Sequence, residues 1–337
     1  MKAWLLHDTG GPDSFSLEEI DTPDPGPGEV RIELKISALN HLDLWVSRGL
    51  PAPKHFPAIL GADGAGTVSA VGPGVAGFEI GDEVIANPST SCGQCRACLS
   101  GEMVFCRQYA ILGEHRSGTL AEEVIVPATN AIPKPADLDW ETAGSFGLAT
   151  GTAYRMLRRA RLRAGETLLV VGVGGGVSSA AMLIGKAIGA RVFVTSRKQE
   201  KIDWAITHGA EAGFDSSGSF SKEMKDVAGA AHVVVENVGP ATWDQSVRSL
   251  APAGRMVVCG STSGTKVEMT LPVLFFKQIE ILGSTMFTHQ EFDETLALLA
   301  TGVVRPPVDM VFPAEDLPAA LARLDAGDQL GKVALVW

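Results

Sequence analysis

The sequence predicts an α/β protein with two domains, a β-rich, barrel-like domain and a doubly wound parallel sheet. The chain has 337 residues, more than one hydrophobic core usually organises, so two domains are expected. Its first third consists of short apolar stretches separated by Gly, Pro and Asp turns, a pattern typical of antiparallel strands. From about residue 166, apolar strand runs alternate with helical stretches, which indicates a parallel sheet covered on both faces.

The clearest strand of the first region lies at residues 30–37. Four apolar residues there alternate with polar ones, which is the period-two pattern of a strand with one wet face: Val30, Ile32, Leu34 and Ile36. Short β-branched pieces follow, with the sequences GTVSAVG, DEVIAN and EEVIVPA. A barrel-like domain fits this series of strands.

The second region supplies the pattern of strand and helix. Strand-like runs TLLVV, RVFVTS, HVVVENV and RMVVCGS are separated by helical stretches such as VSSAAMLIGKAIG and KQEKIDWAITHG. After Gly264 we predict a strand in FFKQIEILGS, two amphipathic helices, and a closing segment, GKVALVW, that returns to the first domain. The expected domains are residues 1–130 with 270–337, carrying a cysteine lobe at 90–108, and residues 131–269.

Charge and hydropathy exclude some classes of partner. The formal net charge of −11 argues against nucleic acid, which requires a cationic face. No apolar run reaches the roughly 18 to 20 residues of a membrane span, and the start MKAWLLHDTGG has no sustained apolar core. We therefore expect a soluble, cytoplasmic protein with a small-molecule partner.

A glycine-rich turn, GVGGGVSS at residues 172–179, lies between an apolar strand and an apolar helix. Glycines allow the backbone to approach a pyrophosphate, and the following helix presents free N–H groups to the anion. Strand, turn, helix and strand in this order predict a dinucleotide site. Ser178 stands where a third glycine is usual. The candidate cofactor residues of the turn are Gly172, Gly174, Gly175, Gly176 and Val177.

The residues after the second strand indicate which dinucleotide is bound. An acid there would bind the adenosine ribose hydroxyls and repel a 2′-phosphate, but the sequence reads Thr195-Ser196-Arg197-Lys198, with Lys201 one turn later. A hydroxyl and cations favour NADPH, with Ser196, Arg197 and Lys201 as candidate ligands. The alternative is that these cations form only a solvated helix start.

Four of the five cysteines lie within one short segment: Cys92, Cys95, Cys98 and Cys106. This spacing suits a closed tetrahedral zinc site with a folding role and no open position for a substrate. An iron–sulfur cluster competes on ligand type alone, and a dispersed disulfide framework does not fit. We predict one structural zinc per chain. Cys259 stands alone in an apolar run and is interpreted as a small buried hydrophobe.

Together, the cysteine lobe, the glycine-rich turn and the segment GADGAGTVSAVGPGVAGFEIGDEV at residues 61–84 resemble the medium-chain dehydrogenase/reductase superfamily. The stretches ALNHLDLWVSRG, ILGEHRSGTLAEE and FFKQIEILGSTM are similar to its zinc-containing alcohol dehydrogenase-like and quinone oxidoreductase-like members. The resemblance covers nearly the whole chain. It implies a GroES-like catalytic domain, a Rossmann NADPH-binding domain, and a homodimer or homotetramer.

The same resemblance indicates that the usual catalytic zinc is missing. Placed on the pattern of zinc alcohol dehydrogenases, the three ligand positions hold Asn40, Ala62 and Phe146. Alanine and phenylalanine cannot bind a metal, so a zinc-bound alkoxide has no support. An irregular metal site remains open as an alternative, drawing on His41, Asp43, Asp63 or His115.

Family members without catalytic zinc reduce quinones or activated alkenes, and this is the leading hypothesis. The cofactor supplies the hydride, and the protein orients the substrate and binds the oxygen where negative charge develops. We expect Asn40 near that oxygen, with His41 and Asp43 beside it; alternatively, the NHLD segment only caps a helix.

Further residues resemble family positions that border the nicotinamide or the phosphates, although ordinary turn chemistry explains each equally well. They are Thr150, Val238, Gly260, Ser261, Gly283, Ser284 and Lys332. Trp45, Phe146 and Phe287 would give an apolar pocket for a carbonyl-containing substrate, unless they are core residues. Two rival functions stay open: an NADP-dependent alcohol dehydrogenase or aldehyde reductase with a non-standard metal site, and a catalytically silent NADPH-binding protein.

Overall fold

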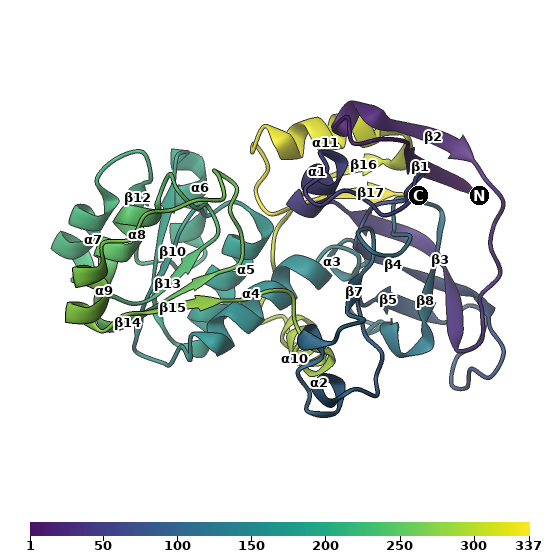
Figure 1. Ribbon diagram of the computed structural model, residues 1–337, viewed down its shortest axis with the longest axis horizontal. Coiled ribbons are helices and arrows are strands. Elements are labelled where there is room, and N and C mark those ends of the chain that lie inside the picture. Colours follow the sequence, from purple (N-terminus) through teal and green to yellow (C-terminus); the bar gives the residue numbers. More distant parts are fainter. The chain divides into compact units, whose positions relative to one another are not determined.

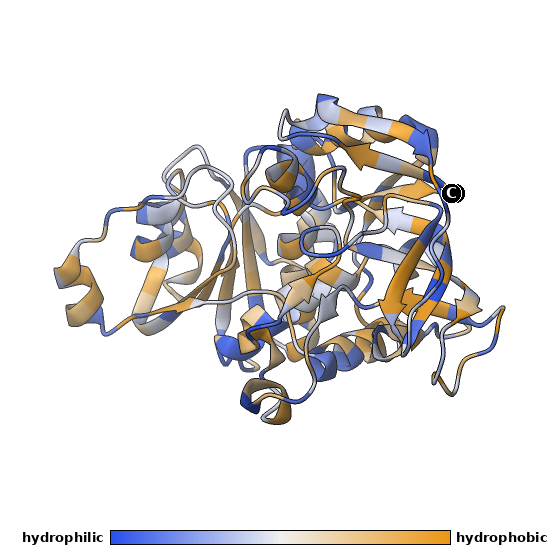
Figure 2. Cartoon of the chain, turned by 45° about the vertical axis from the view of Figure 1, so that its right-hand side comes forward, coloured by the Kyte–Doolittle hydropathy of each residue, from blue (hydrophilic) through white to orange (hydrophobic).

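The computed structural model describes residues 1–337, which form two compact units (Figure 1). The first unit comprises Met1–Ala149, Phe287–Ala300 and Pro307–Trp337, and the second comprises Thr150–Met286 and Thr301–Pro306. Apolar residues gather along the strands of both units (Figure 2). The predicted fold class, a GroES-like β domain with a Rossmann-type parallel sheet, is confirmed.

The first unit is built on a seven-stranded sheet in which β8 (Glu123–Pro127) pairs with β3 (Glu29–Ala38) beside the main path. That path runs in the order β16 (Val308–Pro313), β17 (Lys332–Val336), β3, β4 (Asp63–Val71), β5 (Glu83–Ala86) and β9 (Ala131–Pro133). Only β16 and β17 pair in parallel. The predicted alternation at residues 30–37 is confirmed, because Val30, Ile32, Leu34 and Ile36 are buried.

Smaller elements complete the first unit. The hairpin β1 (Lys2–Leu6) and β2 (Phe15–Glu19) and the pair β6 (Ser89–Thr90) and β7 (Ala110–Ile111) are separate two-stranded sheets. Its helices are α1 (His41–Ser47), α2 (Arg96–Leu99), α3 (Trp140–Ala143), α10 (His289–Ala300) and α11 (Leu317–Asp325). The short helices η1 (Pro12–Ser14), η2 (Met103–Phe105), η3 (Ala128–Asn130) and η4 (Ala314–Asp316) lie in its loops.

The second unit contains a six-stranded, fully parallel sheet. Its order is β12 (Ala212–Asp215), β11 (Arg191–Ser196), β10 (Thr167–Val170), β13 (Ala231–Glu236), β14 (Leu250–Val258) and β15 (Glu280–Gly283). The order reverses at β10 and β13, which is the switch point where doubly wound sheets bind dinucleotides. The strands are apolar because helices cover both faces of such a sheet.

The helices of the second unit follow the strands in alternation. They are α5 (Gly176–Ile188), α6 (Gln199–Thr207), α7 (Phe220–Ala228), α8 (Trp243–Ser249) and α9 (Leu271–Lys277), while α4 (Gly147–Arg159) begins at the end of the first unit. The core between sheet and helices contains Leu169, Phe193, Phe220 and Met256, all nearly inaccessible to solvent.

The structure moves both expected boundaries of the second domain. The expected limits were residues 131 and 269, whereas the second unit runs from Thr150 to Met286. At the first limit, β9 extends the first sheet by pairing with β5. At the second, residues 271–283 form α9 and then β15, the last strand of the parallel sheet. The expected single strand FFKQIEILGS is thus a helix end followed by a strand.

No helix of the structure is long and apolar enough to cross a membrane.

Candidate active site and metal centre

A buried polar network joins Asn40 to Lys332 and Asp63 within the first unit. Lys332 Nζ donates to Asn40 Oδ1 at 2.6 Å and to Asp63 Oδ2 at 2.8 Å. Asn40 Nδ2 donates to the same Asp63 Oδ2 at 3.0 Å. The three residues are only 7, 4 and 1 % exposed, in the order Asn40, Lys332 and Asp63. A buried charge requires a partner, and here cation and anion supply it to each other.

Strand register brings these groups together. In the antiparallel pair of β17 with β3, Ala334 lies opposite Ala38, and Leu39 N donates to Val333 O at 2.9 Å. In the pair of β3 with β4, Ala38 lies opposite Asp63. Lys332, Asn40 and Asp63 therefore lie at the adjacent ends of three neighbouring strands.

Asp63 is held from more than one side. Its second carboxylate oxygen, Oδ1, accepts the backbone N–H of Leu148 at 2.6 Å, and its backbone carbonyl accepts the hydroxyl of Thr119 at 2.8 Å. The bond from Leu148 fixes the carboxylate relative to the start of α4, and the bond from Thr119 holds the backbone of Asp63. Neither Thr119 nor Leu148 was identified from the sequence, because a backbone donor and a distant threonine carry no motif.

Asp43 braces the start of α1. Its two carboxylate oxygens accept the backbone N–H groups of Asn40 at 2.7 Å and Gly61 at 3.0 Å. Burial raises the pKa of Asp43 to about 6, against the opposing effect of the bonds from Asn40 and Gly61 and of the nearby Lys332 charge. Each oxygen accepts a backbone N–H, which is the capping role that the alternative interpretation gave to the NHLD segment.

The aromatic residues expected to line a pocket divide into two groups. Phe146 and Phe287 are fully buried and both pack on Phe292. Their ring centroids lie 5.1 and 5.6 Å, respectively, from the ring centroid of Phe292. They are core residues, as the alternative interpretation held. Trp45, the third of these residues, is half-buried on α1, and its ring centroid lies 6.3 Å from that of His41.

The irregular metal site is not assembled. The four lobe cysteines form the only group of three or more His, Cys, Asp or Glu side chains whose ligand atoms come together. Asp43 and Asp63 are engaged by the hydrogen bonds given above, and His115 Nδ1 accepts the backbone N–H of Ile111 at 3.3 Å. The set His41, Asp43, Asp63 and His115 therefore offers no convergent ligands.

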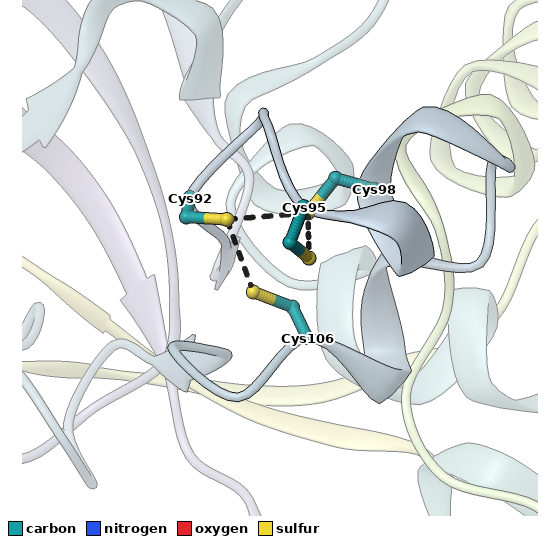
Figure 3. A group of neighbouring side chains, drawn as sticks. All are labelled: Cys92, Cys95, Cys98 and Cys106. Atoms are coloured by element: carbon teal, nitrogen blue, oxygen red, sulfur yellow. Dashed lines mark hydrogen bonds between the residues drawn. The ribbon is translucent and has the colours of Figure 1, made fainter.

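The cysteine lobe, by contrast, brings its four thiols together as predicted. Cys92, Cys95, Cys98 and Cys106 place their Sγ atoms within 4.8 Å of one another and point toward a common centre (Figure 3). Cys92 lies 3.9 Å from Cys98 and 3.5 Å from Cys106, and Cys95 lies 3.6 Å from Cys98, measured between Sγ atoms. A tetrahedron with Zn–S bonds of about 2.3 Å has edges of about 3.8 Å. The residues therefore fit a structural zinc with all four positions filled by protein.

The glycine-rich turn of the second unit has the backbone that a diphosphate site requires. Gly172 and Gly174 have φ angles of 73° and 119°, which favour glycine, and Gly175 caps α5. Thr195 Oγ1 accepts the N–H of Gly172 at 3.1 Å, which ties the turn to β11. At the place of the third glycine, the buried Ser178 hydroxyl donates to Val171 O at 3.1 Å and accepts from Asn237 Nδ2 at 3.0 Å.

The candidate cofactor residues of the second unit gather at the carboxyl edge of its sheet. Because the strands are parallel, the segments that follow them meet at one edge. Ser263 N donates to Val238 O at 2.7 Å, and this bond joins the loops after β13 and β14. This edge carries Gly172, Gly174, Gly175, Gly176, Val177, Ser196, Arg197, Val238, Gly260, Ser261, Gly283 and Ser284.

Lys201 and Arg197 differ in the exposure of their side chains. The Arg197 side chain is exposed after the end of β11. Lys201 is buried, and a Cβ added at Gly174 would lie 2.3 Å from its Cδ and 3.0 Å from its Nζ. The Lys201 side chain thus lies directly over the glycine-rich turn.

Two further candidates belong to other elements. Thr150 is buried in α4. Lys332, expected to border the nicotinamide or the phosphates, belongs to the first unit and bonds Asn40 and Asp63. The sequence did carry a signal for the pairing of Lys332 with Asp63. Each of these charges stands in an otherwise apolar or glycine-rich strand, and a buried charge requires an opposite one.

The lobe yields a test by metal content. We expect Cys106→Ala to lose most of the bound zinc and to unfold at a lower temperature, because three thiolates leave the site open. The matched control is Cys259→Ala, which removes a half-buried thiol outside the lobe. Zinc per chain is measured by elemental analysis after exhaustive dialysis. Equal zinc in the two variants would contradict the assignment.

Asp43 yields a test by pH. Its pKa is raised in the folded state, so the folded protein holds the proton more tightly and loses stability as pH rises from about 4 through about 6. Asp43→Asn has no such group, so its deficit in unfolding free energy relative to wild type is expected to shrink by on the order of 1 kcal/mol between pH 5 and 7. Urea unfolding at several pH values measures this. The exposed control Asp137→Asn should show a constant difference; a constant difference for Asp43→Asn as well would refute the prediction.

Known proteins are similar to this chain over almost its whole length. Residues 26–136 match the alcohol dehydrogenase GroES-like domain, and residues 176–301 match the zinc-binding dehydrogenase domain. The acryloyl-coenzyme A reductase of Metallosphaera sedula is 32 % identical over 336 residues, covering 99 % of each chain. The crotonyl-CoA reductase of Streptomyces avermitilis is 28 % identical and covers 96 % of this chain and 82 % of that protein.

Solved structures give the same result. The crystal structure of an NAD-dependent alcohol dehydrogenase superposes with a TM-score of 0.97 at 39 % identity, covering all of both chains. The crotonyl-CoA carboxylase/reductase AntE in complex with NADP superposes with a TM-score of 0.92 at 25 % identity, over 100 % of this chain and 94 % of that one. The chain therefore belongs to the medium-chain dehydrogenase/reductase superfamily of oxidoreductases, as a zinc-type alcohol dehydrogenase-like member.

Proposed function

We propose that this protein is an NADPH-dependent reductase of a carbon–carbon double bond conjugated with a carbonyl group, and that it works without a catalytic zinc. The observation that carries the proposal is the Asn40 site. The position of the first zinc ligand holds an amide bonded to Lys332 and Asp63, and the other two positions hold Ala62 and the core residue Phe146. A donor amide without a metal suits a developing enolate oxygen.

The relatives favour one substrate class. Two relatives at 31 and 32 % identity are acryloyl-coenzyme A reductases, and a third is a crotonyl-CoA reductase. Enoyl thioesters are accordingly the first substrates to test, before quinones, enones and enals. NADPH, when bound, supplies a hydride to the β-carbon of the substrate, and the α-carbon takes a proton.

The chain's own residues supply orientation and charge stabilisation. Asn40 is proposed to donate a hydrogen bond to the carbonyl oxygen, where negative charge develops as hydride arrives. Asp43 holds the start of α1, and with it Asn40, in place through the bonds to Asn40 and Gly61. His41 follows Asn40 in the first turn of α1 and stays a candidate for substrate contact.

An alcohol dehydrogenase function is the second candidate, because the NAD-dependent alcohol dehydrogenase structure is 39 % identical over the full chain. It would require a second metal site. Two measurements separate the candidates: zinc per chain, one against two, and reduction of NADP⁺ by alcohols. Tight NADPH binding without turnover on any thioester, quinone or enone would support the silent binding protein instead.

Cofactor choice tests the nucleotide site. Arg197→Ala is expected to weaken NADPH binding about 10- to 100-fold with little effect on NADH, because an exposed guanidinium suits the 2′-phosphate. Lys201→Ala should weaken both nucleotides alike, because Lys201 lies over the turn that would cradle the shared diphosphate. Fluorescence titration gives both dissociation constants. If Arg197→Ala weakens the binding of NADPH and of NADH equally, Arg197 does not bind the 2′-phosphate.

Turnover tests the proposed reaction. Asn40→Ala should lower kcat with an enoyl thioester about 100- to 1,000-fold, the usual effect of losing an oxyanion donor, while the dissociation constant of NADPH stays unchanged. The matched control is Asn130→Ala, a buried asparagine whose amide donates only to the carbonyls of Asn87 and Ser89. Unchanged turnover in Asn40→Ala would leave Asn40 with a structural role alone.

A further inference from the structure

The side chain of Asn40 lies between a group that can only donate hydrogen bonds and a group that can only accept them. Lys332 carries an ammonium with three donors and no acceptor, and an ionised Asp63 carboxylate accepts only. Asn40 Oδ1 lies 2.6 Å from Lys332 Nζ, and Asn40 Nδ2 lies 3.0 Å from Asp63 Oδ2. An asparagine amide is symmetrical enough in shape to fit either way round, so its surroundings decide its orientation.

Here the surroundings permit one orientation. If the amide were turned over, Nδ2 would face the ammonium and Oδ1 would face the carboxylate, which places donor against donor and acceptor against acceptor. Burial strengthens the penalty, because no solvent replaces the lost bonds at sites 7 % exposed or less. Lys332 and Asp63 therefore fix which end of the Asn40 amide carries the oxygen and which carries the N–H donors.

One hydrogen-bond donor of the Asn40 amide is not used by Asp63. Nδ2 carries two hydrogens, and the bond to Asp63 uses one. The partners themselves are held: Leu148 N–H binds Asp63 Oδ1, and the Asp43 carboxylate binds the backbone of Asn40. The amide thus keeps one N–H whose direction is set by a rigid frame, which is the preorganisation that a hydrogen bond to an oxyanion requires.

We propose that Lys332 and Asp63 are positioning residues that set the orientation of the Asn40 amide, so that one N–H is presented to the substrate carbonyl oxygen. The inference rests on the proposed function, in which Asn40 binds that oxygen. It gives Lys332 a role different from a contact with the cofactor phosphates, since two of its three N–H donors are engaged by Asn40 and Asp63.

A double-mutant cycle tests the proposal by kinetics. Lys332→Gln replaces the donor-only group with an amide that presents either a donor or an acceptor, so it no longer dictates the orientation of Asn40. We expect kcat to fall about 10- to 100-fold, with the KM of the thioester and the dissociation constant of NADPH within about twofold of wild type. Lys332→Arg, which keeps a donor-only cation, should restore most of the turnover. In an Asn40→Ala background, Lys332→Gln should cause no further loss.

Two kinetic outcomes would overturn the proposal. Weakening of NADPH binding by tenfold or more in Lys332→Gln would make Lys332 a phosphate contact. Losses in kcat that multiply in the double variant would show that Lys332 acts independently of Asn40. If Lys332→Gln does not fold, the double variant Asp63→Asn, Lys332→Gln removes both charges together and leaves no buried carboxylate unpaired.

A spectroscopic measurement tests the orientation without any substrate, and so separates this proposal from the proposed function. The chain contains four asparagines: Asn40, Asn87, Asn130 and Asn237. After selective ¹⁵N labelling of asparagine, the side-chain signal of Asn40 is assigned from its absence in Asn40→Ala. We expect two widely separated proton shifts in wild type and Lys332→Arg, because one proton binds a carboxylate, and a collapsed separation in Lys332→Gln. An unchanged Asn40 signal in Lys332→Gln would refute positioning, whereas a changed signal in a protein that reduces no conjugated carbonyl would refute only the proposed function.

Discussion

The buried ion pair between Lys332 and Asp63 is the interaction on which the first unit's site depends. It joins the last strand, β17, to β4 across β3, and it encloses Asn40 between the two charges. Removing one member would leave an uncompensated buried charge, at a cost of about 3 to 5 kcal/mol. The chain thus ends in a strand whose first residue completes a site begun by residues 40 and 63.

This pair also places an ammonium, neutralised by a carboxylate, beside Asn40, the residue at the first ligand position. The side chain at the first ligand position faces an ammonium rather than offering a thiolate, and the neighbouring positions are alanine and a core phenylalanine. A Lewis acid polarises a bound oxygen strongly, while an oriented amide stabilises charge that develops on it. The second kind of chemistry suits hydride addition to a conjugated double bond, in which the oxygen gains charge only as the reaction proceeds.

The two local motifs are independent of this site. The four-cysteine lobe fills a tetrahedral site with protein ligands, which suits stability and leaves no position for a substrate. The glycine-rich turn and the strand ends around it form a single edge, where Lys201 lies over Gly174 and Arg197 is exposed. In the proposed NADPH complex, Lys201 would contact the diphosphate that all nicotinamide dinucleotides share, and Arg197 the 2′-phosphate that distinguishes NADPH.

The sequence by itself determined the features that depend on short-range patterns. The alternation at residues 30–37, the cysteine spacing and the strand, turn and helix around Gly172 each predicted a structure that was found, because period, ligand spacing and backbone freedom are properties of neighbouring residues. Tertiary structure alone decided the rest. The resemblance indicated only that Lys332 borders the nicotinamide or the phosphates, whereas strand register pairs it with residues 292 and 269 positions away. The bonds from both Asp43 oxygens to the backbone of Asn40 and Gly61 could not be read from the sequence. Nor could the position of Phe275 and Phe276 in α9, before residues 280–283 pair with β14. Partners so distant in sequence leave no local signal, and only the pairing of strands brings them into contact.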